Sequence, residues 1–381
     1  MLKSVKIENF RCFKSFELQQ LGRINLLVGE NNSGKTSILE AIQLLCSRTD
    51  LDPLTEIITN RGEDFWDNDG KGEYQLDICH LFYGHEIKPG SKFSISAINN
   101  NTQEKLDILI ATLPENNTSY GYDETHISEE NVSSKNEYLD EFKKLAFITE
   151  WTNNELPPEK LSLYISPDSG LPINSIMMFR NRKSLGASIT PKRQFVKSSS
   201  LTREEMIDLF DQLVLTPEEN IIAEALNKID SKIKRIAPIS SQKSKYSSDS
   251  RGGFLVLLAD GKRVPIGSMG DGIWRILGLA LAIVSAKDGY LFVDEIDTGL
   301  HFTAMSDMWK MIWDTAQKLN VQVFATTHNS DCWKSLADIA QQENVTDDGI
   351  RIHRIEKGKS KSIVFNEAQI VIAAERELEV R

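Results

Sequence analysis

Eight consecutive residues near the start of the chain have the types and the spacing needed to bind phosphate. They are Gly29, Glu30, Asn31, Asn32, Ser33, Gly34, Lys35 and Thr36, and they match G-x-x-x-x-G-K-[ST] in full. The glycines let backbone N–H groups point into a concave anion site. Lys35 can reach the β- and γ-phosphates of a nucleotide, and the Thr36 hydroxyl can hold Mg²⁺. The sequence therefore predicts a site for a nucleoside triphosphate with Mg²⁺.

A second group of chemical residues lies far along the chain, where two apolar runs end. The run GYLFV ends in Asp294 and Glu295. One carboxylate can serve the metal, directly or through water, while the other polarises the attacking water. Residues 321–325 form the next apolar run and lead to His328, just beyond its end. Read in isolation, such a histidine is a polar residue satisfied by its neighbours.

Strands and helices must position these groups. Residues 24–28 read as a buried strand, and Ile38, Ala41, Ile42 and Leu45 share one face of the helix that follows. The free N–H groups at the start of that helix, where Thr36 and Ser37 lie, favour an anion. We expect residues 289–293 and 321–325 to form buried strands. A helix over 302–319 lies between these strands in the sequence.

A turn of small residues precedes a strongly apolar helix predicted over 276–286. Its members are Ser268, Gly270, Asp271 and Gly272. A hydroxyl together with helix N-terminal N–H groups can form a γ-phosphate site. The alternative interpretation is a glycine-rich helix cap without a ligand.

Composition limits the remaining possibilities. The chain has 381 residues, 40% of them hydrophobic, and a formal net charge of −11, which argues against a protein that coats nucleic acid over its whole surface. It has no apolar run of ~20 residues and no signal-peptide pattern at the N-terminus, so we expect a cytoplasmic protein without a membrane segment. Four scattered cysteines predict reduced thiols rather than disulfides or a metal site.

The other expected elements frame these motifs. Residues 4–10 read as an edge strand and 13–18 as a second strand. Residues 72–110 predict antiparallel strands and 99–135 an exposed loop, with further strands at 161–165 and 173–179. Capping boxes at Thr202 and Thr216 begin two helices, the second with a stripe that reaches Ile233. A linker over 236–250, hairpins over 254–266 and 350–365, and a helix over 366–378 follow.

One segment stands out by its charge. Residues 180–200 contain no acidic residue and six basic ones: Arg180, Arg182, Lys183, Lys192, Arg193 and Lys197. This block, 180–197, can contact nucleic-acid phosphates or an acidic partner. The alternative is a solvated loop.

The motifs together resemble the AAA_15/AAA_21 group of ABC-type ATPases, near the OLD family and RecF. The segments that carry the likeness are ENFRCF, SMGDGIWRILGLALAIVSAKDGYLFVDEIDTGLH and VQVFATTHNSDCW. The resemblance implies that Arg11 lies near the phosphates, unless it is a surface arginine. It also implies that Ser268 and Gly270 act in trans, that Asp297 lies at a dimer seam, and that His328 is a switch histidine. Relatives of this size often work with a separate TOPRIM-type effector in anti-phage defence.

The resulting prediction is an α/β P-loop NTPase: an ABC-type ATPase head with an antiparallel β-subdomain and a helical insertion. Residues 1–179 and 251–381 would form the head, and 180–250 a helical, partly basic insertion. Two chains would hold ATP and Mg²⁺ between them, with Lys35, Glu295 and His328 as catalytic residues. Three functions stay open: a defence ATPase with an effector, a RecF-like DNA clamp, and a scaffold that uses ATP as a slow structural switch.

Overall fold

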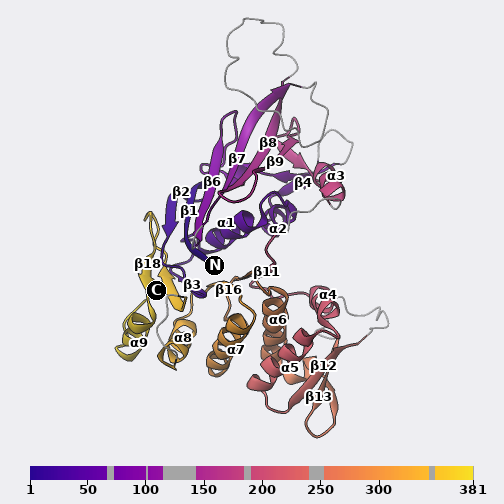
Figure 1. Cartoon of the computed structure of the whole chain (residues 1–381), viewed down its shortest axis with the longest axis vertical. Coiled ribbons are helices and arrows are strands. Elements are labelled where there is room, and N and C mark those ends of the chain that lie inside the picture. The colour runs from indigo at the N-terminus through magenta and orange to yellow at the C-terminus, as the bar shows by residue number, and fades with distance from the viewer. Residues whose placement is uncertain are drawn as a thin grey trace, which may run out of the picture. The chain divides into compact units, whose positions relative to one another are not determined.

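The computed structural model describes residues 1–66, 73–99, 102–114, 143–183, 190–239, 253–342 and 348–380, which form two compact units (Figure 1). The first unit contains Met1, residues 18–39 and residues 191–381, and the second contains residues 2–17 and 40–190. Apolar side chains between Val196 and Ile236 join the core of the first unit. The predicted boundaries of the insertion, 180–250, stay a prediction.

A six-stranded sheet, in the order β11-β15-β16-β3-β17-β18, forms the centre of the first unit. Its strands are β3 (Ile24–Val28), β11 (Arg193–Val196), β15 (Tyr290–Val293), β16 (Gln322–Thr326), β17 (Ile350–Arg354) and β18 (Ile363–Phe365). All neighbours are parallel except β17 and β18. Strands β3, β15 and β16 are buried along their whole length, which explains their unbroken apolar runs.

The order of the sheet positions the chemical motifs. Strand β16 lies between β3 and β15, and all three are parallel. Their carboxyl ends therefore meet at one edge of the sheet. The phosphate-binding loop leaves β3 at this edge, the two carboxylates follow β15, and His328 follows β16. This is the juxtaposition that the predicted site requires.

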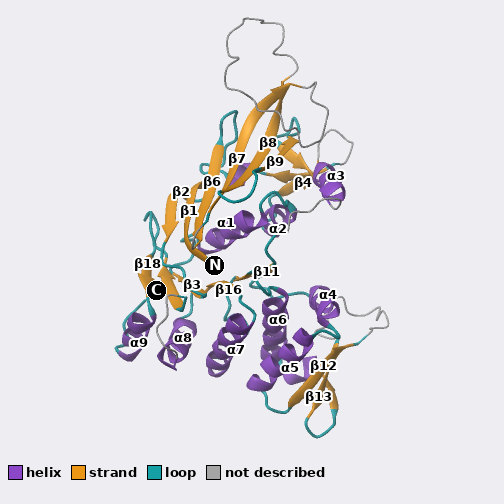
Figure 2. Ribbon diagram, in the orientation of Figure 1, coloured by secondary structure: helices purple, strands orange, loops and turns teal. Residues whose placement is uncertain are grey.

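Helices lie in a row along one side of this sheet (Figures 1 and 2). They are α6 (Asp271–Ser285), α7 (Met305–Lys318), α8 (Ser330–Gln342) and α9 (Glu367–Glu375). Ile24, Leu26 and Val28 alternate along β3 and join the same core cluster as these helices. Helix α6 is buried from Trp274 to Val284 because α4 and α5 cover it as well. The core thus fixes the turn from which α6 starts.

Helices α4 (Arg203–Leu213) and α5 (Pro217–Ile229) precede this core in the sequence. The Thr202 capping box is present, with Glu205 as its partner. At α5 the Thr216 side chain caps no N–H group, and Glu219 instead accepts a hydrogen bond from the Leu215 N–H group. Ile233, predicted to continue the α5 stripe, lies in β12. Strands β12 (Ile233–Pro238), β13 (Phe254–Leu258) and β14 (Arg263–Pro265) form a small sheet that contains the predicted hairpin.

The second unit is built on an antiparallel sheet in the order β2-β1-β6-β7-β8-β9. Its strands are β1 (Leu2–Phe10), β2 (Phe13–Leu18), β6 (Lys92–Asn99), β7 (Gln103–Pro114), β8 (Lys143–Asn153) and β9 (Glu159–Tyr164), and a small sheet joins β4 (Asp64–Trp66), β5 (Tyr74–Asp77) and β10 (Gly170–Pro172). This confirms the β-subdomain. Strand β1 is not at the edge of the sheet, because it pairs with β6, which lies ~90 residues later in the sequence.

Helix α1 (Lys35–Ser47) begins in the first unit and continues into the second, which also contains α2 (Asp52–Asn60) and α3 (Ile173–Lys183). Helix α3 replaces the strand predicted over 173–179, since a short apolar run does not distinguish the two states. The predicted loop over 99–135 is strand over Gln103–Pro114, and 115–142 lie outside the described residues. No described helix has the length and apolarity to span a membrane.

His353 on β17 gives the first unit a pH-dependent stability. The ring is fully buried, with Nε2 3.4 Å from Asn25 Oδ1, and burial lowers the pKa of His353 to about 3. The unfolded chain binds a proton near pH 6.5, whereas the folded chain does not, so stability falls as the pH falls. We expect protonation of His353 in the unfolded chain to lower the free energy of unfolding by about 2 kcal/mol between pH 7 and pH 5. Denaturant unfolding at both pH values should show a smaller loss in His353→Asn; an equal loss would contradict this assignment.

Candidate functional site

The phosphate-binding loop joins β3 to α1 through backbone conformations that need glycine. Gly29 has φ +146°, and a Cβ there would lie 2.3 Å from the Ile355 carbonyl oxygen. Gly34 has φ +97°, which is also outside the range of most side chains. The loop contains Glu30, Asn31 and Asn32, and it leads into α1 at Lys35. Sequence and structure therefore agree on a tight loop at a helix N-terminus, where backbone N–H groups favour an anion.

Two side chains of the loop suit phosphate binding. Lys35 Nζ donates to the carbonyl oxygens of Gly29 and Glu30, both at 2.8 Å, so the ammonium group lies over the loop. Burial lowers the pKa of Lys35, while Asp294 and Glu295 act in the opposite direction. Ser33 Oγ is buried without a hydrogen-bond partner in the described structure. A buried hydroxyl of this kind is suited to a ligand, because an unpaired polar group is costly.

Thr36 and Asp294 meet across the edge of the sheet, although 258 residues separate them. Thr36 Oγ1 lies 3.1 Å from Asp294 Oδ1 and 3.2 Å from Oδ2. Thr326 Oγ1 donates to Asp294 Oδ1 at 2.6 Å and accepts from the Glu295 N–H group at 2.8 Å. Two oxygens of an octahedral Mg²⁺ shell lie about 3 Å apart. The hydroxyl and the carboxylate therefore fit the predicted Mg²⁺ ligands.

Glu295 follows Asp294 but has different neighbours. Its backbone has φ +47°, and its carboxylate lies 3.7 Å from His328 Nδ1 and 3.4 Å from Thr298 Oγ1. Both side chains of the Glu295–His328 pair are partly exposed, 42% and 50%. The carboxylate is thus held at the surface of the site, beside an imidazole, where water has access. This arrangement suits a general base with a histidine neighbour.

The loops after β15 and β16 are tied together behind these side chains. Asp297 is buried, and its Oδ1 accepts from Thr327 Oγ1 at 2.6 Å. The Ile296 N–H group donates to the Thr326 carbonyl oxygen at 3.0 Å. Asp297, predicted at a dimer seam, therefore has an internal partner that orders the loop after Glu295. Its role at a seam stays a prediction.

The signature-like turn lies in the short helix η3 (Ile266–Met269) and the first residues of α6. Ser268, Gly270 and Asp271 are exposed, and Gly272 is partly exposed. Gly270 is the N-cap of α6 with φ +93°, and no side chain caps this helix. The turn is consistent with both interpretations of the sequence, an anion site that acts in trans and a glycine cap.

Arg11 is enclosed in ion pairs and is not a surface arginine. Its guanidinium contacts both oxygens of Glu63, at 2.8 and 3.0 Å, and lies 2.7 Å from Glu40 Oε2. Only 6% of the residue is exposed. All three residues belong to the second unit. Proximity of Arg11 to a nucleotide stays a prediction, and the contacts seen here are with carboxylates.

Arg275 is a buried residue of the site that the motifs did not single out. From α6, its guanidinium donates to the carbonyl oxygens of Lys197 at 2.9 Å and Glu295 at 3.1 Å, and only 3% of the residue is exposed. Burial lowers the pKa of Arg275 to about 10. The side chain thereby connects the start of α6 to the backbone of Glu295. Its position three residues after Gly272 is the feature of the sequence that could have indicated a place in the site.

We expect Arg275→Met to lower kcat on the order of 10-fold, because Glu295 loses a bond that fixes its backbone. KM for ATP should stay near the wild-type value, since the phosphate-binding loop is untouched. Steady-state ATP hydrolysis measures both constants, and denaturant unfolding reports stability. Arg351→Met is the matched control: Arg351 is also buried, and it pairs with Glu367 on α9. Equal kcat losses in the two variants would show a general effect of destabilisation.

Comparison with known proteins identifies the chain. The family model AAA_15, described as an AAA ATPase domain, matches residues 1–332. The chain belongs to this family. An "ATP/GTP phosphatase" of Helicobacter pylori is 24% identical to this AAA_15 chain over 342 residues, which cover 86% of the chain and 85% of that protein. The DNA replication and repair protein RecF of Clostridioides difficile is 32% identical over 94 residues, 25% of this chain and 22% of that protein.

Solved structures similar to this AAA_15 chain include SMC heads. The SMC head domain of Thermotoga maritima has a TM-score of 0.42 at 11% identity and covers 96% of this chain and 98% of that one. An SMC head derived from Pyrococcus furiosus has a TM-score of 0.45 at 11% identity, with 99% of both chains covered. The family match confirms that this chain is an AAA_15 ATPase. It also confirms the AAA_15 part of the resemblance inferred from the motifs.

Proposed function

We propose that this AAA_15 ATPase is a nucleotide-driven switch in which two chains hold two ATP molecules head to tail. The observation that carries the proposal is the meeting of Thr36 with Asp294, with Glu295 next along the same strand end. This arrangement supports hydrolysis at the carboxyl edge of the sheet. The exposed turn at Ser268 supports the second part, because an exposed anion site can act on ATP held by another chain.

Each residue has a distinct role in the proposed reaction. The loop N–H groups and Lys35 bind the β- and γ-phosphates, for which Lys35 exchanges its bonds to Gly29 and Glu30. Thr36 and Asp294 hold Mg²⁺, which when bound offsets the negative charge of the phosphates. Glu295 accepts the proton of the attacking water, and His328 lies beside it to contact the γ-phosphate. Loss of the γ-phosphate would then weaken the contact between chains.

A mixing experiment tests action in trans. Lys35→Ala removes the phosphate ligand of one chain and Ser268→Arg blocks the turn of the other, so each variant alone should be inactive. In a mixed dimer, one site keeps an intact loop and an intact turn. We expect the mixture to recover roughly a quarter of wild-type turnover, since about half of the dimers are mixed and each has one working site. A mixture as inactive as its components would exclude action in trans.

The finer role of the switch is proposed from the resemblance. In that proposal the partner is a separate TOPRIM-type effector in anti-phage defence, and the protein works in the cytoplasm. Co-purification from the native host with Glu295→Gln, which should retain ATP, tests this. Recovery of a TOPRIM protein that depends on ATP and is lost in Lys35→Ala is the expected result. Recovery of the same protein with both variants would show that its binding does not depend on the ATP-driven switch.

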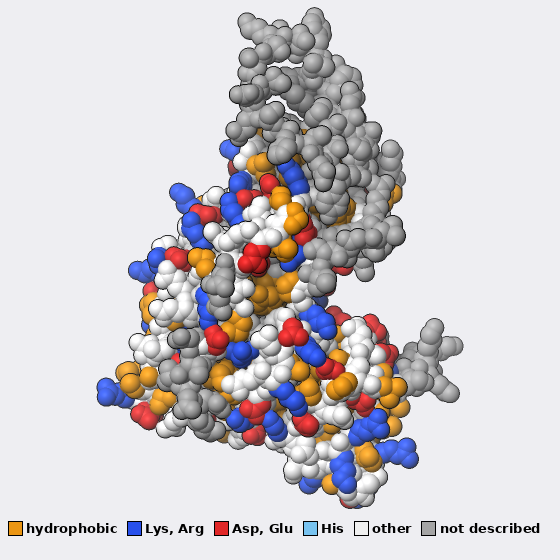
Figure 3. Space-filling model, viewed as in Figure 1, with side chains coloured by type: hydrophobic (Ala, Val, Ile, Leu, Met, Phe, Trp, Pro, Cys, Tyr) orange, Lys and Arg blue, Asp and Glu red, His pale blue; other side chains and the backbone are white. Residues whose placement is uncertain are grey.

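A RecF-like DNA clamp is the second candidate, favoured by the similarity to RecF over 94 residues. The basic block that would contact DNA is partly regular structure: its start lies in α3 and residues 193–196 form β11, while 184–189 lie outside the described residues. On the face in Figure 3, described Lys and Arg side chains are interspersed with Asp and Glu. Binding of duplex DNA with a steep dependence on salt would favour the clamp.

A further inference from the structure

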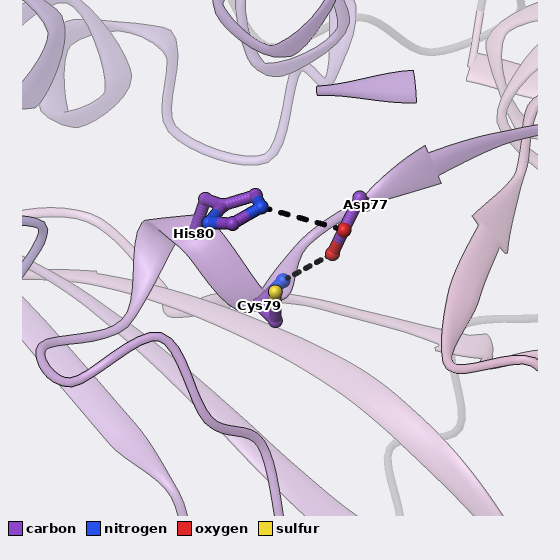
Figure 4. Close-up of side chains that lie close together, drawn as sticks. All are labelled: Asp77, Cys79 and His80. Carbon is purple, nitrogen blue, oxygen red and sulfur yellow. Dashed lines mark hydrogen bonds and ion pairs between the residues drawn. The ribbon is translucent and has the colours of Figure 1, made fainter. Parts of the chain in front are cut away.

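The turn after β5 brings together three side chains of the kinds that bind transition metals. Asp77, Cys79 and His80 each offer one ligand atom, and these atoms lie within 4.8 Å of one another (Figure 4). Among the described residues, this is the cluster whose donor atoms are grouped closely enough for one ion. It lies in the second unit and includes none of the residues assigned to ATP.

The distance between Asp77 and His80 suits a small tetrahedral site. Asp77 Oδ2 lies 3.5 Å from His80 Nε2, which is long for a hydrogen bond. It matches the separation of two ligand atoms of a tetrahedral Zn²⁺ ion, about 3.3–3.5 Å for bonds of about 2.0–2.2 Å. Asp77 Oδ1 accepts from the Cys79 N–H group at 3.1 Å, which fixes the carboxylate and leaves Oδ2 facing the histidine. The geometry thus presents an oxygen and a nitrogen at the edge length of the ion's shell.

A second histidine orients the first. His80 Nδ1 lies 3.2 Å from His85 Nδ1, so one of these nitrogens donates to the other. When His80 Nδ1 is the donor, His80 Nε2 carries the lone pair and faces Asp77. Metal-bound histidines typically donate their other N–H group in this way, which fixes the tautomer and the ring orientation. His85 therefore completes the arrangement without being a ligand.

We propose that Asp77, Cys79 and His80 bind one Zn²⁺ ion, with a water or an external donor in the fourth position. The combination of thiolate, imidazole and carboxylate favours zinc over the oxygen-binding cations Mg²⁺ and Ca²⁺. Glu63 is not a ligand, because both of its oxygens contact Arg11. The side chains of Asp77 and His80 are 32% and 40% exposed, so an ion has access.

The position of the turn indicates what the ion would do. The Leu81 carbonyl oxygen accepts from the Arg11 N–H group at 2.9 Å, and Phe82 forms a bridge with Phe10. The Asp77 N–H group donates to the Glu63 carbonyl oxygen at 2.9 Å. The ion would therefore brace the turn against β1 and against the segment that carries the Arg11–Glu63 pair. Its expected effect is on the stability of the second unit.

The test uses the full chain, stripped with a chelator and titrated with Zn²⁺, and with Co²⁺ as a spectroscopic probe. We expect one equivalent of tight binding, a thiolate-to-cobalt charge-transfer band, and a higher unfolding temperature with Zn²⁺. Cys79→Ser should abolish the band, and His80→Ala should abolish tight binding. His85→Ala should weaken binding by about 10–100-fold, as loss of an orienting partner does.

Matched controls separate this site from incidental binding. Cys12→Ser removes an exposed cysteine and His301→Ala an exposed histidine, and both should bind Zn²⁺ as the wild type does. Circular dichroism of the stripped variants checks that Cys79→Ser and His80→Ala fold without metal. The proposal is overturned if the wild type binds no equivalent, or if folded Cys79→Ser binds as tightly and with the same spectrum. ATP binding by the stripped chain is a separate measurement, so failure here leaves the ATPase assignment intact.

Discussion

Glu295→Gln is expected to retain ATP binding and to hydrolyse ATP at least ~100-fold more slowly than the wild type, a loss of about 2.7 kcal/mol of transition-state stabilisation. The amide has nearly the same shape as the carboxylate but cannot accept the proton of the attacking water. Asp294, which is hydrogen-bonded to Thr36 and Thr326, is left unchanged. Binding of labelled ATP and single-turnover hydrolysis measure the two properties separately.

The control for this variant is Glu30→Gln, a change of the same type in the exposed part of the phosphate-binding loop. Its turnover should stay within a few-fold of the wild-type value, since only the Glu30 backbone carbonyl contacts Lys35. Near-wild-type turnover in Glu295→Gln would remove Glu295 from the role of base. Very slow turnover in the wild type itself would instead favour the scaffold that uses ATP as a slow structural switch.

Lys35→Ala is expected to abolish nucleotide binding at concentrations that saturate the wild type. The ammonium group is the one loop side chain with a full positive charge, and its two bonds to loop carbonyls hold it over the site. Truncation removes the charge and leaves those carbonyls without this donor. Equilibrium binding of a fluorescent ATP analogue measures the loss, and denaturant unfolding checks that the loop still folds.

Lys35→Arg is the conservative comparison, because it keeps the charge but is too broad to replace a compact ammonium donor on two adjacent carbonyls. Partial binding by Lys35→Arg and none by Lys35→Ala would show that charge matters apart from fit. ATP binding by Lys35→Ala with wild-type affinity would place the phosphates elsewhere. Lys6→Ala, which removes an exposed lysine of β1 in an ion pair with Glu8, is a charge-matched control.

The sequence predicted the site best where the chemistry is local. The phosphate-binding loop lies between a strand and a helix that the apolar pattern predicts. Asp294 directly follows a buried strand, and His328 lies two residues beyond the end of another. Arg275 was not predicted as a site residue because its partners are backbone carbonyls, and any residue supplies those. Arg11 contacts Glu40 and Glu63, which are distant in sequence, so no local pattern indicated these partners.

The fold was harder to predict where tertiary pairing decides. Strand β11 was hidden in the basic block, because its four residues become a strand only through pairing with β15. Strand β1 has the alternating pattern of an edge strand, yet β6 pairs with it. Residues 173–179 form a helix although their apolar run suggested a strand. In each case the local pattern permits two states, and contacts with distant residues select one of them.

Strand β16 lies between the strand of the phosphate-binding loop and the strand of the carboxylates. Asp294 and Glu295 therefore have different neighbours and can be altered separately. Asp294 is held by Thr36 and by Thr326 of β16, whereas Glu295 faces His328 and Thr298 in the loops beyond. Substitutions of the outer neighbours, His328 and Thr298, are therefore expected to slow ATP hydrolysis without weakening ATP binding. Such variants would differ in the lifetime of the ATP-bound state rather than in their affinity for ATP.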